Sequence, residues 1–348
     1  MDTRLQSLTL WVRQFSGFED AEAEPVSGDA SFRRYFRVWR QPQSGQPIPF
    51  IVMDAPPEHE DCGPFLAIAR HWHDHGVAVP GIEAEDLEQG FLLLEDFGDR
   101  LMLSDLTGNN ADTLYREALE ELVAIQQLPS PPDYALPPYD AALLDREMSL
   151  FPDWLLEQHL GMELDNGTRC LLDTTFAFLR ESALAQPEVT VHRDYHSRNL
   201  LIRAGTGRPG VIDFQDAVTG PITYDAVSLL KDCYIAWPEE RLSRWLESFR
   251  KATLEKGLHH ADPDTFRQWF ELMGMQRHLK AAGIFARLAI RDGKPGYLGD
   301  IPRTVNYLIR ASSRQPALRH FHEWLAGTVM PLIEEKIGPA PALEDTPL

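Results

Sequence analysis

The chain has 348 residues, with 53 Asp and Glu against 33 Lys and Arg, which gives a formal net charge of −20. This length suggests two domains or lobes of about 150 residues each and a core that needs no disulfide or metal staple. The excess of acids argues against nucleic acid as a partner, because phosphate binding needs a surplus of Lys and Arg.

The first fifteen residues place Leu5, Leu8, Val12 and Phe15 on one face of a helix, with charged residues between them. This is an amphipathic helix rather than the unbroken apolar core of a signal peptide. No apolar run in the sequence approaches the roughly 20 residues needed to cross a membrane. Three widely spaced cysteines argue against a disulfide framework. We therefore expect a cytoplasmic protein that needs no membrane and no obligate protein partner.

The N-terminal part of the chain reads as strands and turns. Residues 25–54 place the turn formers QPQSGQP between two β-forming runs, which predicts a hairpin. A helix is expected over 64–75, and the runs VAVPGIEAE and GFLLLEDF predict two further strands. We expect a first lobe at residues 1–98 that ends in a hinge at about 94–98.

Helical patterns dominate after Gly98. The predicted helices cover 112–127, 140–150, 153–160, 168–185, 225–236, 239–257, 264–291 and 316–337. Between them, residues 189–214 contain three short β-type runs, TVH, NLLI and GVIDF. The sequence thus predicts an α+β fold of two lobes, with a β-rich N-terminal lobe and a mainly helical C-terminal lobe at 99–348.

The strongest chemical signal is VHRDYHSRNLLI at 191–202, followed by GVIDF at 210–214. Phosphoryl transfer needs a carboxylate that accepts the proton of the attacking hydroxyl, and oxygen ligands for Mg²⁺ near the phosphates. Asp194, Asn199 and Asp213 supply these groups in the required order. Each alone could be a turn residue, a cap or a strand end. Together they predict that Asp194 is the catalytic base and that Asn199 and Asp213 bind Mg²⁺.

Around this loop stand His192-x-Asp194-x-His196-x-x-Asn199, then Ile212-Asp213-Phe214, then Tyr224-Asp225. This set resembles the aminoglycoside phosphotransferase/choline kinase family. The resemblance implies a protein-kinase-like two-lobed fold, with ATP and Mg²⁺ used to phosphorylate a small molecule. Protein kinases usually carry Lys where His196 stands. Only eleven residues separate Asp213 from Asp225, too few for a segment that docks a polypeptide.

Four stretches resemble, more narrowly, the anomeric sugar kinases of peptidoglycan recycling, which act on N-acetylmuramate and N-acetylglucosamine. They are SGDASFRRYFRV, VMDAPPE, the region 147–154 and RDGKPGYLGDIPRTVNYL. The resemblance implies transfer of phosphate from ATP to the C1 hydroxyl of the sugar. Two other interpretations remain open: a kinase of another small molecule, such as an aminoglycoside, choline or a different sugar, and a catalytically inactive pseudokinase scaffold.

On the nucleotide side, Ser27, Gly28 and Asp29 lie in a short loop between strand-like runs, where backbone N–H groups can contact phosphate. Glu95 and Phe97 fall where kinases of this fold hold adenine through main-chain groups, and we expect the same role here. An ordinary turn and an ordinary strand end explain these two segments equally well.

One departure from the kinase pattern concerns the strand lysine and the helix glutamate that pairs with it. Aligned on VMDAPP, Asp54 falls at the lysine position and Phe65 near the glutamate position, so both charges are absent together. We expect Arg33 or Arg34 to replace the lysine. Strand alternation favours Arg33, because Arg34 is in phase with Phe36. Arginines that simply face solvent are the competing interpretation.

For the acceptor we expect Glu147, Trp154, His196 and Arg198 to contact the substrate. Glu147 and Trp154 lie on or beside the apolar stripe of LLDREMSLFPDWLLEQ, where a carboxylate needs donors such as sugar hydroxyls. An internal salt bridge for Glu147 and core packing for Trp154 are the alternatives. A lactyl carboxylate would also require a cation, and the segment 287–303 carries several. Cations that stabilise a helix C-terminus are the competing interpretation of this segment, and the favoured one.

Overall fold

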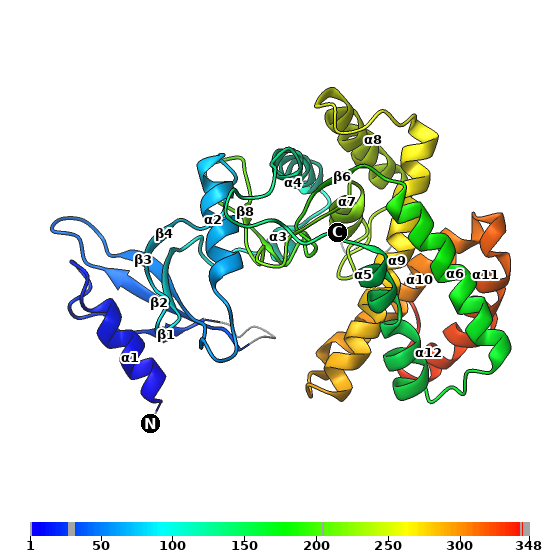
Figure 1. Cartoon of the computed structure of the whole chain (residues 1–348), viewed down its shortest axis with the longest axis horizontal. Helices are drawn as coiled ribbons and strands as arrows, with labels where there is room; N and C mark the ends of the chain where they lie inside the picture. The colour runs from blue at the N-terminus through cyan, green and yellow to red at the C-terminus, as the bar shows by residue number, and fades with distance from the viewer. Residues whose placement is uncertain (1, 27–31, 204, 342, 344–348) are drawn as a thin grey trace. The chain divides into compact units, whose positions relative to one another are not determined.

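The computed structural model describes residues 2–26, 32–203, 205–341 and 343 (Figure 1). The chain divides into two compact units. The first consists of Met1–Arg100, Pro131–Ala135 and Leu200–Asp216, and the second of Leu101–Ser130, Leu136–Asn199 and Ala217–Leu348. The unit boundary at Arg100 lies close to the predicted lobe boundary at 98, and the segment 200–216 belongs with the first unit rather than with the helices that surround it in sequence.

A five-stranded antiparallel sheet forms the first unit, in the order β1-β2-β3-β5-β4. Its strands are β1 (Glu24–Pro25), β2 (Arg34–Arg40), β3 (Ile48–Asp54), β4 (Ile82–Asp86) and β5 (Phe91–Glu95). The predicted hairpin is β2–β3, with Arg34 opposite Asp54 and Arg40 opposite Ile48. The predicted helix 64–75 is α2 (Gly63–Asp74).

Helix α1 (Thr3–Val12) packs on one face of this sheet. Its Leu8, Trp11 and Val12 share a core with apolar side chains from alternate positions of β2, β3 and β5. Because side chains alternate between the faces of a strand, Tyr35 and Arg37 of β2 lie on the other face. The two faces therefore differ: α1 closes one, and the other carries the polar Tyr35 and Arg37 of β2 beside the buried apolar Met53, Leu92 and Leu94 of β3 and β5.

The first unit also holds a small hairpin, β7 (Leu200–Leu201) and β8 (Gly210–Val211), with Leu200 opposite Val211. A Cβ at Gly210 would lie 2.3 Å from the ring of Phe97, so only glycine allows this approach. The N–H of Val211 donates to the carbonyl of Ala78 at 2.7 Å. These contacts fix the hairpin to the segments around α2 and after β5.

The second unit is mainly helical, with one two-stranded sheet of β6 (Glu188–Val191) and β9 (Val218–Pro221). Its helices are α3 (Met102–Asp105), α4 (Ala111–Gln126), α5 (Ala141–Met148), η1 (Phe151–His159), α6 (Asn166–Leu184), α7 (Tyr224–Leu230), α8 (Glu239–Glu255), α9 (Pro263–Ile290), η2 (Pro295–Asp300), α10 (Ile301–Ser313), η3 (Pro316–Leu318), α11 (Arg319–Trp324), η4 (Leu325–Val329) and α12 (Met330–Lys336). Helix α9 contacts α5, α6, α7, α8 and α10, and it is buried along most of its length (Figure 1).

The α+β class and most helix positions are as predicted, but the short helices α3 and η2 were not expected, and three further predictions differ. Helix α10 was not expected. Pro302 lies in its first turn, and a proline there is a helix-start signal, but the Gly-rich run before it obscured this signal. The helix predicted over 316–337 is divided into 3₁₀, α and π segments. Helix α7 ends at Leu230, six residues early. In the described part of the chain, no helix has the length and apolarity required to cross a bilayer.

Candidate active site

The loop between β6 and β7 holds the predicted catalytic residues in a fixed conformation. Asp225, at the start of α7, accepts hydrogen bonds from the N–H groups of His192 at 2.7 Å and Arg193 at 3.0 Å. Burial raises the pKa of Asp225 to about 7, although the two N–H groups favour its ionised form. The side-chain amide of Asn199 donates to the carbonyl of Asp194 at 3.0 Å. Contacts at both ends of the loop thus orient Asp194.

Arg193 adopts a left-handed conformation, with φ of 76°. This conformation costs a non-glycine residue about 1–2 kcal/mol, so the surrounding structure must impose it. The backbone N–H is held by Asp225, and the guanidinium is held by Glu147 at 2.7 Å. The strained residue therefore lies directly before Asp194, which is typical of a functional loop.

Asp194, the predicted base, is ionised at neutral pH. Burial alone would raise its pKa, but Lys280, His196 and Arg277 lower the pKa well below its usual value. Burial lowers the pKa of His196, so this histidine is neutral at pH 7. Asp194 and His196 both line a cavity of about 150 Å³ in the second unit. The arrangement suits a base that faces a small hydroxyl compound.

A buried ion cluster adjoins this carboxylate. Glu147 of α5 accepts from Arg193 at 2.7 Å, from Lys280 of α9 at 3.1 Å, and from the hydroxyl of Tyr139. Lys280 also donates to the hydroxyl of Tyr224 at 3.0 Å. Burial would raise the pKa of Glu147, but Lys280 and Arg193 keep it below its usual value. Both oxygens of Glu147 are therefore engaged by protein donors.

The cavity beside Asp194 is lined by charged and aromatic side chains. The lining residues are Asp194, His196, Asp232, Cys233, Tyr234, Arg277, Lys280, Ala281, Ile284, Phe285, Leu288 and Tyr297. Of the predicted acceptor residues in the described chain, His196 is in this lining, Arg198 stacks on its Tyr234, and Glu147 and Trp154 are not in it. Trp154 lies half-buried in η1.

In the first unit, Arg33 lies directly before β2, and its charge interacts with Tyr35, which is on the face away from α1. Its guanidinium pairs with Glu60 at 3.0 Å, and both side chains are only about one tenth exposed (11% and 12%). Burial would lower the pKa of Arg33, but Tyr35, Glu60 and the carboxylates of Asp216 and Asp213 raise it. Arg33 therefore carries a permanent charge in the field of Asp213.

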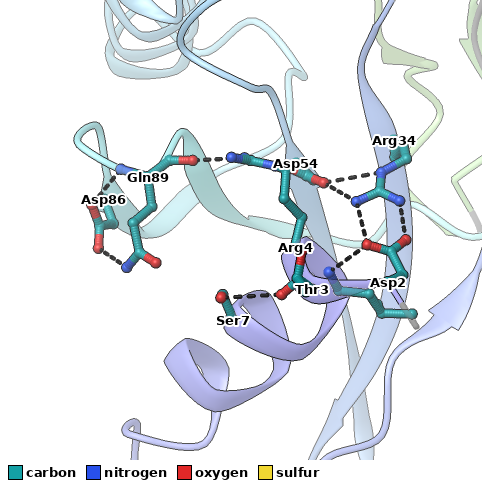
Figure 2. Close-up of polar contacts among 9 residues, drawn as sticks. Asp2, Thr3, Arg4, Ser7, Arg34, Asp54, Asp86 and Gln89 are labelled. Atoms are coloured by element: carbon teal, nitrogen blue, oxygen red, sulfur yellow. Dashed lines mark hydrogen bonds and ion pairs between the residues drawn. The ribbon is translucent and has the colours of Figure 1, made fainter.

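Asp54 lies on the opposite face of the same sheet, toward α1 (Figure 2). It is fully buried and accepts from Arg4 at 3.0 Å and from Arg34 at 2.5 Å; Arg34 also pairs with Asp2. The alignment that placed Asp54 at the lysine position is therefore wrong about its direction, because the strand alternation points it away from Arg33. The charge of Arg34 is already paired with two carboxylates, which leaves Arg33 as the candidate.

Phe65 confirms that the helix glutamate is absent. Its ring stacks on Phe214 with centroids 4.9 Å apart, and Trp72 of the same helix lies 5.7 Å from Phe214. Phe214 directly follows Asp213, whose backbone is left-handed with φ of 65° and whose carboxylate accepts from Gln215 at 2.7 Å. An aromatic contact thus holds this segment where kinases usually have an ion pair.

The remaining predictions for the nucleotide site concern Glu95, Phe97 and the loop of Ser27, Gly28 and Asp29. The carboxylate of Glu95 lies 3.5 Å from Arg203, and its backbone N–H donates to the carbonyl of Gly81 at 2.8 Å. The ring of Phe97 lies 4.3 Å below the guanidinium of Arg203. Ser27, Gly28 and Asp29 lie outside the described residues, so their predicted contact with phosphate stays a prediction.

Sequence reasoning missed several of the charged residues around Asp194, above all Lys280 and Arg277 of α9. Both are less than a tenth exposed. A signal was present in the sequence, because the middle of α9, LMGMQRHLKAAGIFA, is mostly apolar or small around the helix and still carries two cations three residues apart. Charges in such a helix need buried partners, and here the partners are at the active site.

These observations fit a small-molecule phosphotransferase, with the predicted base Asp194 in a fixed loop beside a cavity. The chain belongs to the phosphotransferase enzyme family, whose sequence model matches residues 22–269. Membership in this family implies ATP and a divalent metal ion.

Two relatives carry the name N-acetylmuramate/N-acetylglucosamine kinase. The protein from Pseudomonas putida is 44% identical over 336 residues, covering 93% of this chain and 96% of the relative. The protein from Pseudomonas aeruginosa is 45% identical over 340 residues, covering 93% and 97%.

Solved structures confirm the predicted protein-kinase-like fold. Aminoglycoside 2'-phosphotransferase-IIIa matches with a TM-score of 0.60 at 15% identity, over 90% of this chain and 99% of that one. Choline kinase from Cryptosporidium parvum matches with a TM-score of 0.60 at 13% identity, over 92% and 99%.

Proposed function

We propose that this chain is an ATP-dependent sugar kinase that phosphorylates the C1 hydroxyl of N-acetylmuramate and N-acetylglucosamine in cell-wall recycling. The observation that carries the proposal is the 44% and 45% identity, over more than nine tenths of the chain, to two kinases with these acceptors in their names. The choice of C1 rests on the resemblance to anomeric sugar kinases. The cytoplasm is the compartment in which ATP is available for this reaction.

In the proposed reaction Asp194 accepts the proton of the C1 hydroxyl as the oxygen attacks the γ-phosphorus of ATP, and the bond from this phosphorus to the β–γ bridging oxygen breaks to release ADP. A hemiacetal hydroxyl is more acidic than an ordinary alcohol, so a carboxylate suffices as base. The low pKa of Asp194 keeps it ionised before each turnover. Neutral His196 lies in the same cavity and can hydrogen-bond the sugar, because its Nδ1 has no partner among the described residues.

Asn199 and Asp213 are the proposed ligands of Mg²⁺, and their chemistry fits this ion. Mg²⁺ prefers oxygen ligands and is usually held by one or two carboxylates together with the phosphates of the substrate. The amide of Asn199 is oriented through its nitrogen by Asp194. Asn199 directly precedes Leu200, which pairs with Val211 two residues before Asp213. The metal would neutralise charge that develops on the phosphates.

For the phosphates of ATP we assign Arg33 as the cation that replaces the strand lysine, with Glu60 as its positioning partner. The pair supports this role because Arg33 is buried, permanently charged and in the field of Asp213. The same assignment keeps Ser27, Gly28 and Asp29 as the phosphate loop and the backbone of Glu95 and Phe97 as the adenine contact.

The decisive experiment incubates the protein with ATP, Mg²⁺ and N-acetylmuramate or N-acetylglucosamine and follows the product by phosphorus NMR. We expect an anomeric phosphate signal from both sugars. Phosphate on another hydroxyl, or turnover only with an aminoglycoside or choline, would replace the proposed acceptor. ATP binding without turnover on any acceptor would favour the inactive scaffold.

A further inference from the structure

The two proposed acceptors differ in one group that the protein must accommodate. N-acetylmuramate is N-acetylglucosamine with a lactyl ether on O3, and the ether ends in a carboxylate. C3 is two carbons from C1 around the ring, so this carboxylate stays close to the catalytic base when C1 reacts. A carboxylate in a partly desolvated site needs a cation with N–H donors.

Arg198 lies in the catalytic loop, between Asp194 and Asn199, and its guanidinium is stacked on aromatic rings. It lies 3.6 Å from the ring centroid of Tyr234 and 5.7 Å from that of Tyr297. Both tyrosines line the cavity that also contains Asp194. Such stacking holds the guanidinium in one plane and leaves its N–H edge for a planar anion.

A buried carboxylate fixes this stack in place. Asp232 accepts from the N–H of Ser197 at 3.1 Å and from its hydroxyl at 2.5 Å, and it also accepts from the N–H of Tyr234 at 3.0 Å. Asp232 is only 1% exposed. The residue before Arg198 and the ring below it are therefore tied to the same group, which preorganises the guanidinium.

The charge of Arg198 is less compensated than those of Lys280 and Arg277, the two cations that line the cavity. Lys280 pairs with Glu147, and Arg277 donates to Ser228 and lies in the fields of Asp194 and Asp232. Within the part of the chain that the structure describes, no carboxylate pairs directly with Arg198. Burial raises the pKa of Asp300 and the charge of Arg198 opposes this rise, but Asp300 forms its ion pair with Arg303, at 3.5 Å.

We propose that Arg198 is the specificity-determining residue that binds the lactyl carboxylate of N-acetylmuramate. This inference rests on the proposed function and adds to it the basis for choosing the acidic sugar. The stacked guanidinium donates two N–H groups to the carboxylate while C1 lies against Asp194. N-acetylglucosamine lacks the carboxylate, so this sugar binds without the contact. Arg198 then stays stacked on its two tyrosines, with water at its N–H groups.

The test compares the two sugars in wild type and in Arg198→Gln, at saturating ATP. Charge-assisted hydrogen bonds of this kind predict a loss of about 10- to 100-fold in kcat/KM for N-acetylmuramate. For N-acetylglucosamine we expect less than about a threefold change by the same argument, and this activity also reports that the variant folds. Arg198→Lys should recover part of the loss, because it keeps the charge but not the paired N–H geometry.

Arg287→Gln tests the competing cation, because Arg287 belongs to the segment 287–303 that the sequence also offered as a partner for the lactyl carboxylate. Arg287 is a half-buried arginine of α9 directly before the cavity-lining Leu288, and its Nε has no partner among the described residues. We expect this variant to treat both sugars as wild type does. If it, rather than Arg198→Gln, loses N-acetylmuramate selectively, the proposal is wrong and Arg287 is the anchor.

Three further outcomes overturn the assignment. Equal losses for both sugars would mean that Arg198 does not recognise the carboxylate. A raised KM for ATP would mean that it binds the nucleotide instead. Unchanged selectivity would remove it from acceptor recognition altogether. A wild-type protein that phosphorylates neither sugar would instead contradict the proposed function, so the two failures are distinguishable.

Discussion

Glu147 in the second unit and Asp54 in the first are each a carboxylate buried between two cations. Glu147 pairs with Arg193 and Lys280, and Asp54 pairs with Arg4 and Arg34. The difference lies in what surrounds the cations. Lys280 and Arg193 also act on Asp194, whereas the partners of Asp54 join α1 to the sheet face that points away from Arg33. A buried ion cluster therefore marks a reaction centre only when its charges reach the reacting group.

The largest effect on activity is expected from substitution of Asp194, whose pKa is lowered by the cations that pair with Glu147. Asp194→Asn should lower kcat by about 10²- to 10⁴-fold, the usual contribution of a positioned general base. The KM for ATP should change little, and an assay of ADP release measures both values. Since the cations hold the pKa of Asp194 low, the wild-type kcat should not fall between about pH 8 and about pH 6 through this group. Near-full activity in the variant would remove Asp194 from this role.

Next in size is the removal of one partner from the same cluster. Lys280→Met leaves Glu147 and Asp194 with less compensation, and breaking a buried ion pair costs about 3–5 kcal/mol of the free energy of unfolding. Chemical denaturation measures this loss. The double variant Glu147→Gln with Lys280→Met should recover part of it, because no carboxylate is then left without its lysine. Additive losses in the double variant would show that the two residues do not act as a pair.

A smaller effect, on the KM for ATP, should distinguish Arg33 from Arg34. Arg33→Met should raise the KM for ATP by about 10- to 100-fold, as expected for lost charge-assisted hydrogen bonds to phosphate. Glu60→Gln should raise it less, and the KM for the sugar should stay constant in both variants. Arg34→Met is the matched control on the neighbouring residue, with less than about a threefold change. The same rise in Arg33→Met and Arg34→Met would end the distinction between the faces.

The sequence predicted the α+β class, the β2–β3 hairpin and the catalytic loop because local patterns determine each of them. Strand alternation also favoured Arg33 over Arg34 as the cation for the phosphates, which stays a prediction. It did not give the partners of Glu147 or the cations of α9, since these meet across long stretches of chain, as Lys280 and Glu147 do. The position of Asp54 failed for a related reason: matching VMDAPP to the kinase pattern ignored the phase of β3, in which Asp54 shares a face with Val52 and Phe50.

Asp54→Asn is expected to change stability and nothing in catalysis. The variant offers one carbonyl oxygen to two guanidiniums, so the free energy of unfolding should fall by about 1–3 kcal/mol, with solvent screening favouring the lower end. Screening is relevant because Arg4 and Arg34 are 32% and 38% exposed. Thermal or chemical unfolding measures the loss.

Glu83→Gln is the control for this last prediction, because Glu83 pairs with Arg40 at the surface of the same sheet at 2.6 Å. Its effect should stay below about 0.5 kcal/mol, as for other exposed pairs. In Asp54→Asn, both kcat and the KM for ATP should equal the wild-type values. A tenfold rise in the KM for ATP at unchanged stability would return Asp54 to the nucleotide site, and buried charge on either face of the sheet would then serve the phosphates.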